Sequence, residues 1–161
     1  MTTVIVLPRE KKIYSDSRVT YGQTRHETGF KKVHKSVDGR LLASGCGDVT
    51  LIAEELVKLG IPKEGFHKDA FSSNKSDTSA TILVLNKYTN TTYEVRLETN
   101  KKSIVKSRKV TYNPPCDYII AGSGGLLASK VHARVDDAEK AITVASYIDK
   151  GTDDKIQKEV L

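Results

Sequence analysis

The chain has 161 residues, of which 38% are hydrophobic and 29% charged, and its formal net charge is +6. These proportions are typical of a soluble globular protein, and they exclude a collagen-like, fibrous or intrinsically disordered chain. Because no apolar run is long enough for a transmembrane helix or a signal peptide, we expect a single domain over residues 1–161 that works in the cytoplasm without membrane contact.

Two cysteines and four histidines leave little room for disulfide or metal chemistry. Cys46 and Cys116 are too few for a disulfide framework, and they lack the spacing of metal ligands. The histidines are scattered, with no pair at helical metal-binding spacing. The sequence therefore predicts a reducing compartment and no metal or cofactor. Cys46 is interpreted as a small, half-buried side chain, with a redox-sensitive residue as the alternative.

The positive charge is concentrated in residues 31–35 and 101–109. Neither stretch has the interleaved aromatic residues or the helix-turn-helix pattern of a nucleic-acid-binding protein. We interpret the second stretch as the solvated face of a strand. An acidic protein partner or a phosphate backbone stays open as the alternative.

The N-terminal quarter is rich in β-forming residues, and its predicted strands are 2–7, 12–20, 30–37 and 40–43. The first two are expected to form a hairpin, and residues 23–28 are expected to be a loop. Asp38-Gly39 is the strongest hairpin signal in the chain and joins the last two strands. The opening is thus predicted to be a meander of four short strands.

A glycine-containing turn, residues 44–48, follows these strands. Asp48 is a suitable N-cap for a helix that ends near Gly60 and Pro62. The apolar residues of this helix fall on one face: Val49, Ile52, Ala53, Leu56 and Leu59. Free backbone N–H groups at such a turn suit an anion or a developing oxyanion, and the simpler interpretation is a strand-to-helix turn without chemistry.

The second half of the chain alternates strand and helix patterns after a polar stretch, 62–78, which has one possible helical turn near 66–71. The predicted strands are 80–88, 93–98, 103–112, 118–121 and a final edge strand at 155–161. Two helices are predicted before that last strand, one over 126–134 and one that starts with a capping box of Asp136 and Glu139. The buried stripe predicted for the second helix is Ala138, Ala141, Ile142, Ala145 and Ile148. This order predicts an α+β fold with helices on the outer faces of two mostly antiparallel sheets.

The first residues of the chain suggest a catalytic group. Thr2 follows Met1 directly, and an aminopeptidase readily removes Met before a residue as small as Thr. The product would carry a nucleophilic hydroxyl and a free α-amine on one residue. Asp16 and Lys32, on neighbouring predicted strands, are suited to tune that hydroxyl, because burial lowers the pKa of a lysine and an acid orients it. The plainer interpretations are an ordinary Met-Thr start and a surface ion pair.

Five segments then form an ordered series along the chain: residues 2–6, 15–22, 31–33, 43–48 and 120–125. Together they resemble the proteasome β-subunit and HslV-like family of N-terminal nucleophile hydrolases. The resemblance covers nearly the whole chain and implies a four-layer αββα sandwich. It also implies a threonine peptidase made of identical subunits in a ring or smaller homo-oligomer, which acts on protein or peptide substrates delivered by an ATP-dependent unfoldase.

The same resemblance implies the roles of the catalytic residues. Thr2 matches the nucleophile, its α-amine would act as general base through a water, and Asp16 and Lys32 match the acid and lysine that tune it. Gly45 matches the glycine whose N–H forms the oxyanion hole, with Ser44 as the alternative alignment.

Further residues match supporting positions of the family. Ser123, in the Gly-Ser-Gly-Gly turn, matches the serine that supports the α-amine, and Asp149 with Thr152 matches an Asp-x-x-Ser element. The predicted substrate-binding residues are Thr20, Lys31 and Gly47.

Two departures from the family pattern bear on function. The stretch between Thr2 and Asp16 is two residues shorter, and an even deletion in a hairpin keeps each side chain on its own face. Residues 62–78 stand where family members carry a second long helix used in stacking rings. A catalytically inactive scaffold or partner-binding protein therefore stays open, and retention of Met1 would remove the free α-amine.

Overall fold

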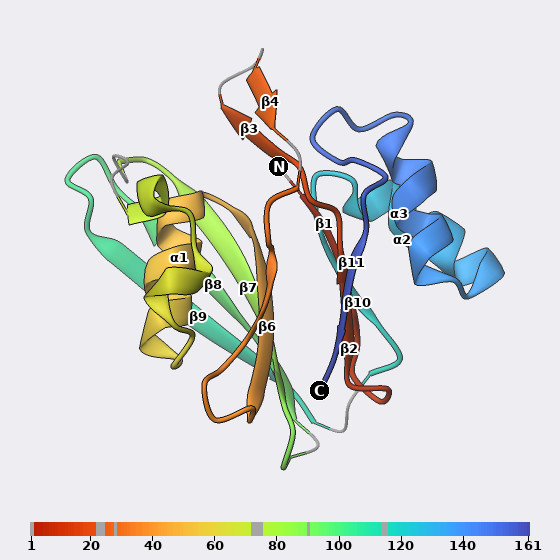
Figure 1. The fold of residues 1–161 in the computed structure, drawn as a ribbon, viewed down its shortest axis with the longest axis horizontal. Coiled ribbons are helices and arrows are strands. Elements are labelled where there is room, and N and C mark those ends of the chain that lie inside the picture. Colours follow the sequence, from red (N-terminus) through yellow and green to blue (C-terminus); the bar gives the residue numbers. More distant parts are fainter. Residues whose placement is uncertain (1, 22–24, 28, 72–75, 90, 114–115) are drawn as a thin grey trace.

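A computed structural model describes residues 2–21, 25–27, 29–71, 76–89, 91–113 and 116–161 (Figure 1). The strands are β1 (Thr3–Leu7), β2 (Lys12–Ser15), β3 (Val19–Tyr21), β4 (Arg25–Glu27), β5 (Val33–Lys35), β6 (Leu41–Gly47), β7 (Ser79–Asn86), β8 (Thr92–Thr99), β9 (Val105–Tyr112), β10 (Ile119–Gly122) and β11 (Gln157–Val160). The helices are α1 (Val49–Lys58), α2 (Gly125–Val135) and α3 (Ala138–Ser146), with 3-10 turns η1 (Lys63–Gly65) and η2 (Lys68–Phe71).

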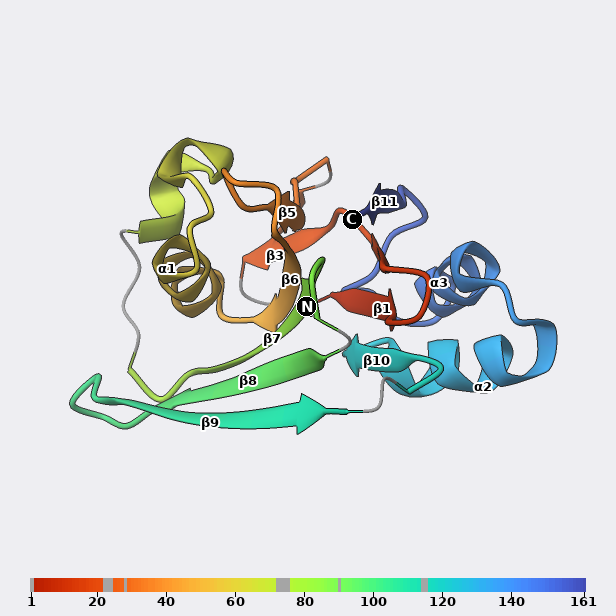
Figure 2. The same ribbon diagram turned by 90° about the horizontal axis from the view of Figure 1, so that it is seen from below.

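The described strands form two main sheets and one separate pair, and all their pairings are antiparallel. One sheet has the order β10-β1-β2-β11, the other has the order β5-β6-β7-β8-β9, and β3 pairs with β4 alone. Figures 1 and 2 show α1 outside the five-stranded sheet and the α2–α3 pair outside the four-stranded sheet. The fold is therefore α+β, as predicted.

Three apolar clusters hold these elements together. Leu56 of α1 packs with Ile82 of β7 on the outer face of the five-stranded sheet. The second cluster lies between the sheets and contains Val4 and Val6, whereas Ile5 belongs to the third, with the residues of α2 and α3. Because successive side chains of a strand point to opposite faces, β1 is buried on both sides, and its start is fixed within the molecule.

The predicted four-stranded meander is wrong. β1 and β2 form the expected hairpin, but β2 ends at Ser15, and β5 and β6 belong to the other sheet. The backbone N–H groups of Ser17 and Arg18 donate to carboxylates instead of to a neighbouring strand, which explains the early end of β2. Residues 25–27, predicted to be a loop, form β4. The later strands match their predicted bounds to within two residues.

The helix boundaries follow their capping residues. Asp48 caps α1 as predicted, since its side chain accepts a hydrogen bond from the Leu51 N–H. Leu51 is buried and Val49 is 42% exposed, so Val49 is not part of the buried face as predicted.

The predicted capping box of the last helix is wrong by one residue. Asp137 caps α3 through the Lys140 N–H, whereas Asp136 adopts a left-handed conformation that ends α2. Aspartate tolerates that conformation, so it can serve here as a helix terminator. Ile148 lies beyond the end of α3 and is 73% exposed, which removes it from the predicted buried stripe.

Several further expectations can be compared with the structure. Residues 105–109 on the edge strand β9 are exposed, as the interpretation of a solvated basic face requires. Between residues 62 and 71 the chain forms only the turns η1 and η2, so no long second helix stands in this described stretch. Cys46 is half-buried. No helix among the described residues is long and apolar enough to cross a membrane.

His34 supplies a test of this packing. It is 3% exposed on β5 and lies against Phe66, with 4.5 Å between ring centroids. Burial, helped by the charge of Lys31, lowers the pKa of His34 from 6.5 to about 4. The unfolded chain therefore binds a proton that the folded protein does not take up between pH 6.5 and about 4, and stability is lost as the pH falls through this window.

We expect the wild type to lose about 2 kcal/mol more stability than His34→Gln between pH 7 and pH 4.5. Urea unfolding of both proteins at the two pH values measures this difference. An equal loss in the two proteins would show that His34 is not held in its neutral form.

Candidate active site

Thr2 and Lys32 meet at the start of β1. The Lys32 Nζ donates to the Thr2 Oγ1 across 2.5 Å, and both side chains are buried in the protein. The same ammonium lies 3.2 Å from each carboxylate oxygen of Asp16. A threonine hydroxyl, a lysine and an acid thus form one connected group, as the sequence predicted for these residues.

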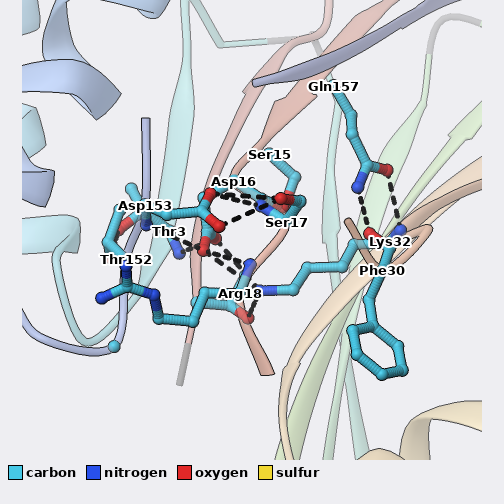
Figure 3. A network of polar contacts seen from close by, with 12 residues as sticks. Thr3, Ser15, Asp16, Ser17, Arg18, Phe30, Lys32, Thr152, Asp153 and Gln157 are labelled. Carbon is cyan, nitrogen blue, oxygen red and sulfur yellow. Dashed lines mark hydrogen bonds and ion pairs between the residues drawn. The ribbon is translucent and has the colours of Figure 1, made fainter. Parts of the chain in front are cut away.

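The Asp16 carboxylate is the centre of this group and is fully buried. It accepts backbone N–H groups from Thr3 at 2.9 Å, Arg18 at 3.0 Å and Asp153 at 3.3 Å, in addition to the Lys32 ammonium (Figure 3). These donors come from three separate parts of the chain. One carboxylate therefore ties together β1, the residues after β2 and the segment before β11.

Burial shifts the pKa values of both partners of the ion pair in the directions that favour their neutral forms. It raises the pKa of Asp16, against the opposing effects of Lys32 and the N–H donors, and it lowers the pKa of Lys32, against the opposing charge of Asp16. A lysine with a lowered pKa exchanges protons more readily near neutral pH than an exposed one. That property suits a group in contact with a hydroxyl nucleophile.

Strand register explains why these residues converge. The pairing of Val4 with Ser15 in the β1–β2 hairpin places Thr3 beside Asp16, so that each residue donates its N–H to an oxygen of the other. Lys32 approaches from the opposite sheet, at the entry to β5. Its carbonyl accepts the Ser44 hydroxyl of β6 at 2.8 Å. The site therefore lies where the two sheets face each other.

A second polar cluster lies beside the first. Ser123 and Thr152 each donate to Asp149 Oδ2 at 2.6 Å, and the Thr152 hydroxyl is 2.7 Å from that of Thr3. Burial raises the pKa of Asp149, but the hydrogen bonds from Ser123, Thr152 and the Gly151 N–H outweigh it and lower the pKa below its ordinary value. Thr3, the neighbour of Thr2, connects this cluster to Asp16.

The Gly-Ser-Gly-Gly turn packs closely against Thr3 and Thr152, and this contact requires glycine at position 124. A Cβ atom at Gly124 would lie 2.9 Å from the Thr152 hydroxyl and closer still to that of Thr3. Only glycine lets the turn approach the two threonines so closely. The missing side chain at Gly124 therefore lets the turn lie close enough for Ser123 to contact Asp149.

The other predicted site residues lie on neighbouring elements. Gly45 is buried in β6, where a Cβ would press on the Ile52 side chain, and its role as an oxyanion donor stays a prediction. Gly47 ends β6 with a φ of 108°, which glycine adopts without strain. Thr20 lies in β3, opposite His26. Lys31 is exposed immediately before Lys32.

An open pocket of about 510 Å³ lies between the segment before β5 and the edge strand β11. Ser17, Gly29, Lys31 and Val33 line one side of it, and residues 155–159 line the other. Lys31 thus borders this pocket, and its contact with substrate stays a prediction.

Sequence reasoning missed two residues of the network, Asp153 and Gln157. Asp153 accepts the Ser17 N–H at 2.9 Å and the Ser17 hydroxyl, while Gln157 contacts the backbone of Phe30 and Lys32. Asp153 stands in a polar run after a helix, and such a run is usually a solvated loop. No signal within the sequence pairs it with a serine 136 positions away.

Comparisons with known proteins bear on the fold. No protein-family model matches the sequence, and no curated protein matches it. Among solved structures, eukaryotic HslV from Trypanosoma brucei is similar, with a TM-score of 0.56, 16% identity and coverage of 98% of each chain.

Two further structures are of Anbu. Anbu from Yersinia bercovieri, described as an ancestral beta-subunit, has a TM-score of 0.55 at 12% identity over 100% of this chain and 81% of that one. The helical assembly of the Anbu complex from Pseudomonas aeruginosa has a TM-score of 0.54 at 11% identity, over 99% and 81% of the two chains. Identities this low show the fold alone. The chain has the fold shared by HslV and Anbu, as its sequence resemblance implied.

We expect the two partners of the buried ion pair to contribute unequally to stability. Asp16→Ala removes the acceptor of three N–H groups and leaves the Lys32 ammonium without a counter-charge, so we expect a loss of about 3–5 kcal/mol. Lys32→Met keeps the apolar stem and leaves the three N–H bonds to Asp16 in place, so its loss should be smaller.

Urea unfolding at pH 7 measures both changes. The exposed pair of Arg9 and Asp117, 3.5 Å apart, provides the matched control, and Asp117→Ala should change stability very little. A greater loss in Lys32→Met than in Asp16→Ala would contradict the central role of the carboxylate.

Proposed function

We propose that this chain, once Met1 is removed, is a threonine-type N-terminal nucleophile peptidase with the four-layer αββα sandwich of the proteasome and HslV-like fold. The observation that carries the proposal is the 2.5 Å contact between Lys32 Nζ and Thr2 Oγ1, backed by the buried Asp16. The three apolar clusters and the fold shared with HslV and Anbu support the architecture.

The first step is acylation of Thr2. Its Oγ1 attacks the carbonyl carbon of a peptide bond while the hydroxyl proton passes through a water to the free α-amine. Lys32 donates to the same oxygen, and its positive charge stabilises the developing alkoxide. Asp16 fixes the ammonium in place and compensates its charge. The N–H of Gly45 donates a hydrogen bond to the oxyanion of the tetrahedral intermediate in this scheme.

The two products leave one after the other, the amine when acylation is completed and the acid when the ester is hydrolysed. The C–N bond breaks, the α-amine returns its proton to the leaving amine, and an ester remains on Thr2. A water then attacks the ester carbon and loses a proton to the α-amine. The bond from that carbon to Thr2 Oγ1 breaks, which frees the acid, and the proton on the α-amine passes to Oγ1 and restores the hydroxyl. Ser123, Asp149 and Thr152 hold the N-terminal residues beside this chemistry through their link to Thr3.

The substrate is a protein or peptide in extended form. Thr20 lies on a strand, so its backbone is suited to pair with an extended chain. Lys31 directly precedes Lys32, and Gly47 ends β6 three residues beyond Ser44, which pairs with Val33 of β5. A homo-oligomer that encloses these sites and an ATP-dependent unfoldase that feeds it complete the proposal, in the cytoplasm. The solved Anbu from Pseudomonas aeruginosa forms a helical assembly, which supports self-association.

A catalytically inactive scaffold is the competing function. The absence of a long helix between residues 62 and 71 favours it, because that helix serves ring stacking in the family that the sequence resembles. The two functions differ in whether Thr2 carries a free amine and whether it cleaves peptides.

The state of the N-terminus decides between these functions. We expect mass spectrometry of the protein purified from cells to show the loss of Met1, and the protein to hydrolyse fluorogenic peptides. Thr2→Ala should reduce kcat by roughly three orders of magnitude or more, since it removes the nucleophile, and Thr2→Ser should retain part of the activity. An intact Met1, or equal hydrolysis by wild type and Thr2→Ala, would exclude this mechanism.

The assembly makes a separate prediction. Size-exclusion chromatography with light scattering should give a mass several times the 17.7 kDa of one chain. Thr2→Ala provides the control, because loss of the nucleophile should leave the mass unchanged. A stable monomer would contradict the enclosed peptidase and favour the scaffold.

A further inference from the structure

The segment that carries Lys32 is held by Ser17 and by two further side chains, and it is part of no described strand. Residues 29–32 are outside the described strands, and β5 begins only at Val33. Ser17 binds the start of the segment, since its hydroxyl accepts the Gly29 N–H at 3.0 Å and its carbonyl accepts the Phe30 N–H at 3.1 Å. The backbone of Lys32 itself is bound by two other side chains.

Gln157 of β11 binds one side of this backbone. Its Oε1 accepts the Lys32 N–H at 2.8 Å, and its Nε2 donates to the Phe30 carbonyl (Figure 3). A side-chain amide offers one acceptor and one donor, as a peptide group does, so Gln157 replaces a strand partner for residues 30 and 32. Ser44 of β6 binds the other side by donating to the Lys32 carbonyl at 2.8 Å.

We propose that Gln157 and Ser44 are positioning residues that hold the Lys32 backbone between the two sheets so that its ammonium reaches Thr2. This inference rests on the proposed peptidase function for its catalytic consequence. Neither residue touches the reacting atoms, and both act through Lys32. Together they fix the N–H and the carbonyl of the same residue from opposite sheets.

The register of β11 explains how the Gln157 amide positions the Lys32 backbone relative to Asp16. Gln157 pairs with Ser15 of β2, and Ser15 directly precedes Asp16. Gln157 is therefore fixed relative to the carboxylate, and its amide transmits that position to the Lys32 backbone. A lysine has a flexible four-carbon stem, so its ammonium reaches a defined point only when its backbone is fixed. Displacements of about 1 Å at a catalytic group can cost on the order of a hundredfold in rate.

The test uses the mature full-length protein and two readouts. The first is kcat and KM for a fluorogenic peptide. The second is the titration of Lys32, followed by NMR of protein labelled with carbon-13 at the lysine Cε, which does not depend on hydrolysis. The variants are Gln157→Ala and Ser44→Ala, with Gln157→Glu as the conservative change that keeps the acceptor for the Lys32 N–H. Val160→Ala is the matched control, because Val160 also lies on β11, is 45% exposed and is not among the residues that line the pocket.

We expect kcat to fall about tenfold or more in Gln157→Ala and Ser44→Ala, with KM within about twofold of the wild type. The Lys32 titration should move toward that of exposed lysines, because a loosened segment admits water to the ammonium. Gln157→Glu should lose less than Gln157→Ala, and Val160→Ala should match the wild type in both readouts.

Unchanged kcat and unchanged Lys32 titration in both alanine variants would overturn the inference. Equal changes in Val160→Ala would also overturn it, since they would reflect general loosening of β11. Where Gln157→Ala fails to fold, Ser44→Ala carries the test. A wild type without peptidase activity would contradict the proposed function. A shifted Lys32 titration in the variants would still support the positioning role.

Discussion

The buried carboxylate of Asp16 is the constraint on which this structure depends. A buried charge without partners costs several kcal/mol, so the fold must bring donors to it from wherever the chain can supply them. Three backbone N–H groups and the Lys32 ammonium meet this need, and they come from β1, from the residues after β2, from the segment before β11 and from the opposite sheet. The convergence of these segments is what makes a site.

The apolar core makes that convergence precise. β1 is buried on both faces, so its position is set by the inter-sheet cluster on one side and by the helices on the other. Thr2 and Thr3 continue this strand into the polar region at its start. Thr3 then donates its N–H to Asp16 and contacts Thr152 with its hydroxyl, so one residue joins both polar clusters next to Thr2. Packing positions the strand, and hydrogen bonds position its first residues.

Local signals in the sequence predicted the elements well where the deciding interaction is local. The Asp48 cap and the β1–β2 hairpin are fixed by residues a few positions apart. The end of β2 was not predictable, because Asp153, which binds the Ser17 N–H, lies 136 positions away. Thr2, Asp16 and Lys32, which the structure brings into contact, were predicted from their chemistry and from family resemblance. Gln157 was not, since a glutamine at the start of an edge strand has no pattern that reveals a distant backbone partner.

The buried lysine bears on the choice between the proposed peptidase and the competing scaffold. An ion pair removed from water is often no more stabilising than well-packed apolar residues of similar volume. The stability of the fold alone therefore gives no reason for Lys32 and Asp16 to be buried together. A perturbed lysine in contact with a hydroxyl is, in contrast, what a nucleophile requires. The hydroxyl concerned belongs to the second residue of the chain, where loss of Met1 would add an amine. The energetic cost of burying this pair therefore supports the proposal of chemistry at Thr2.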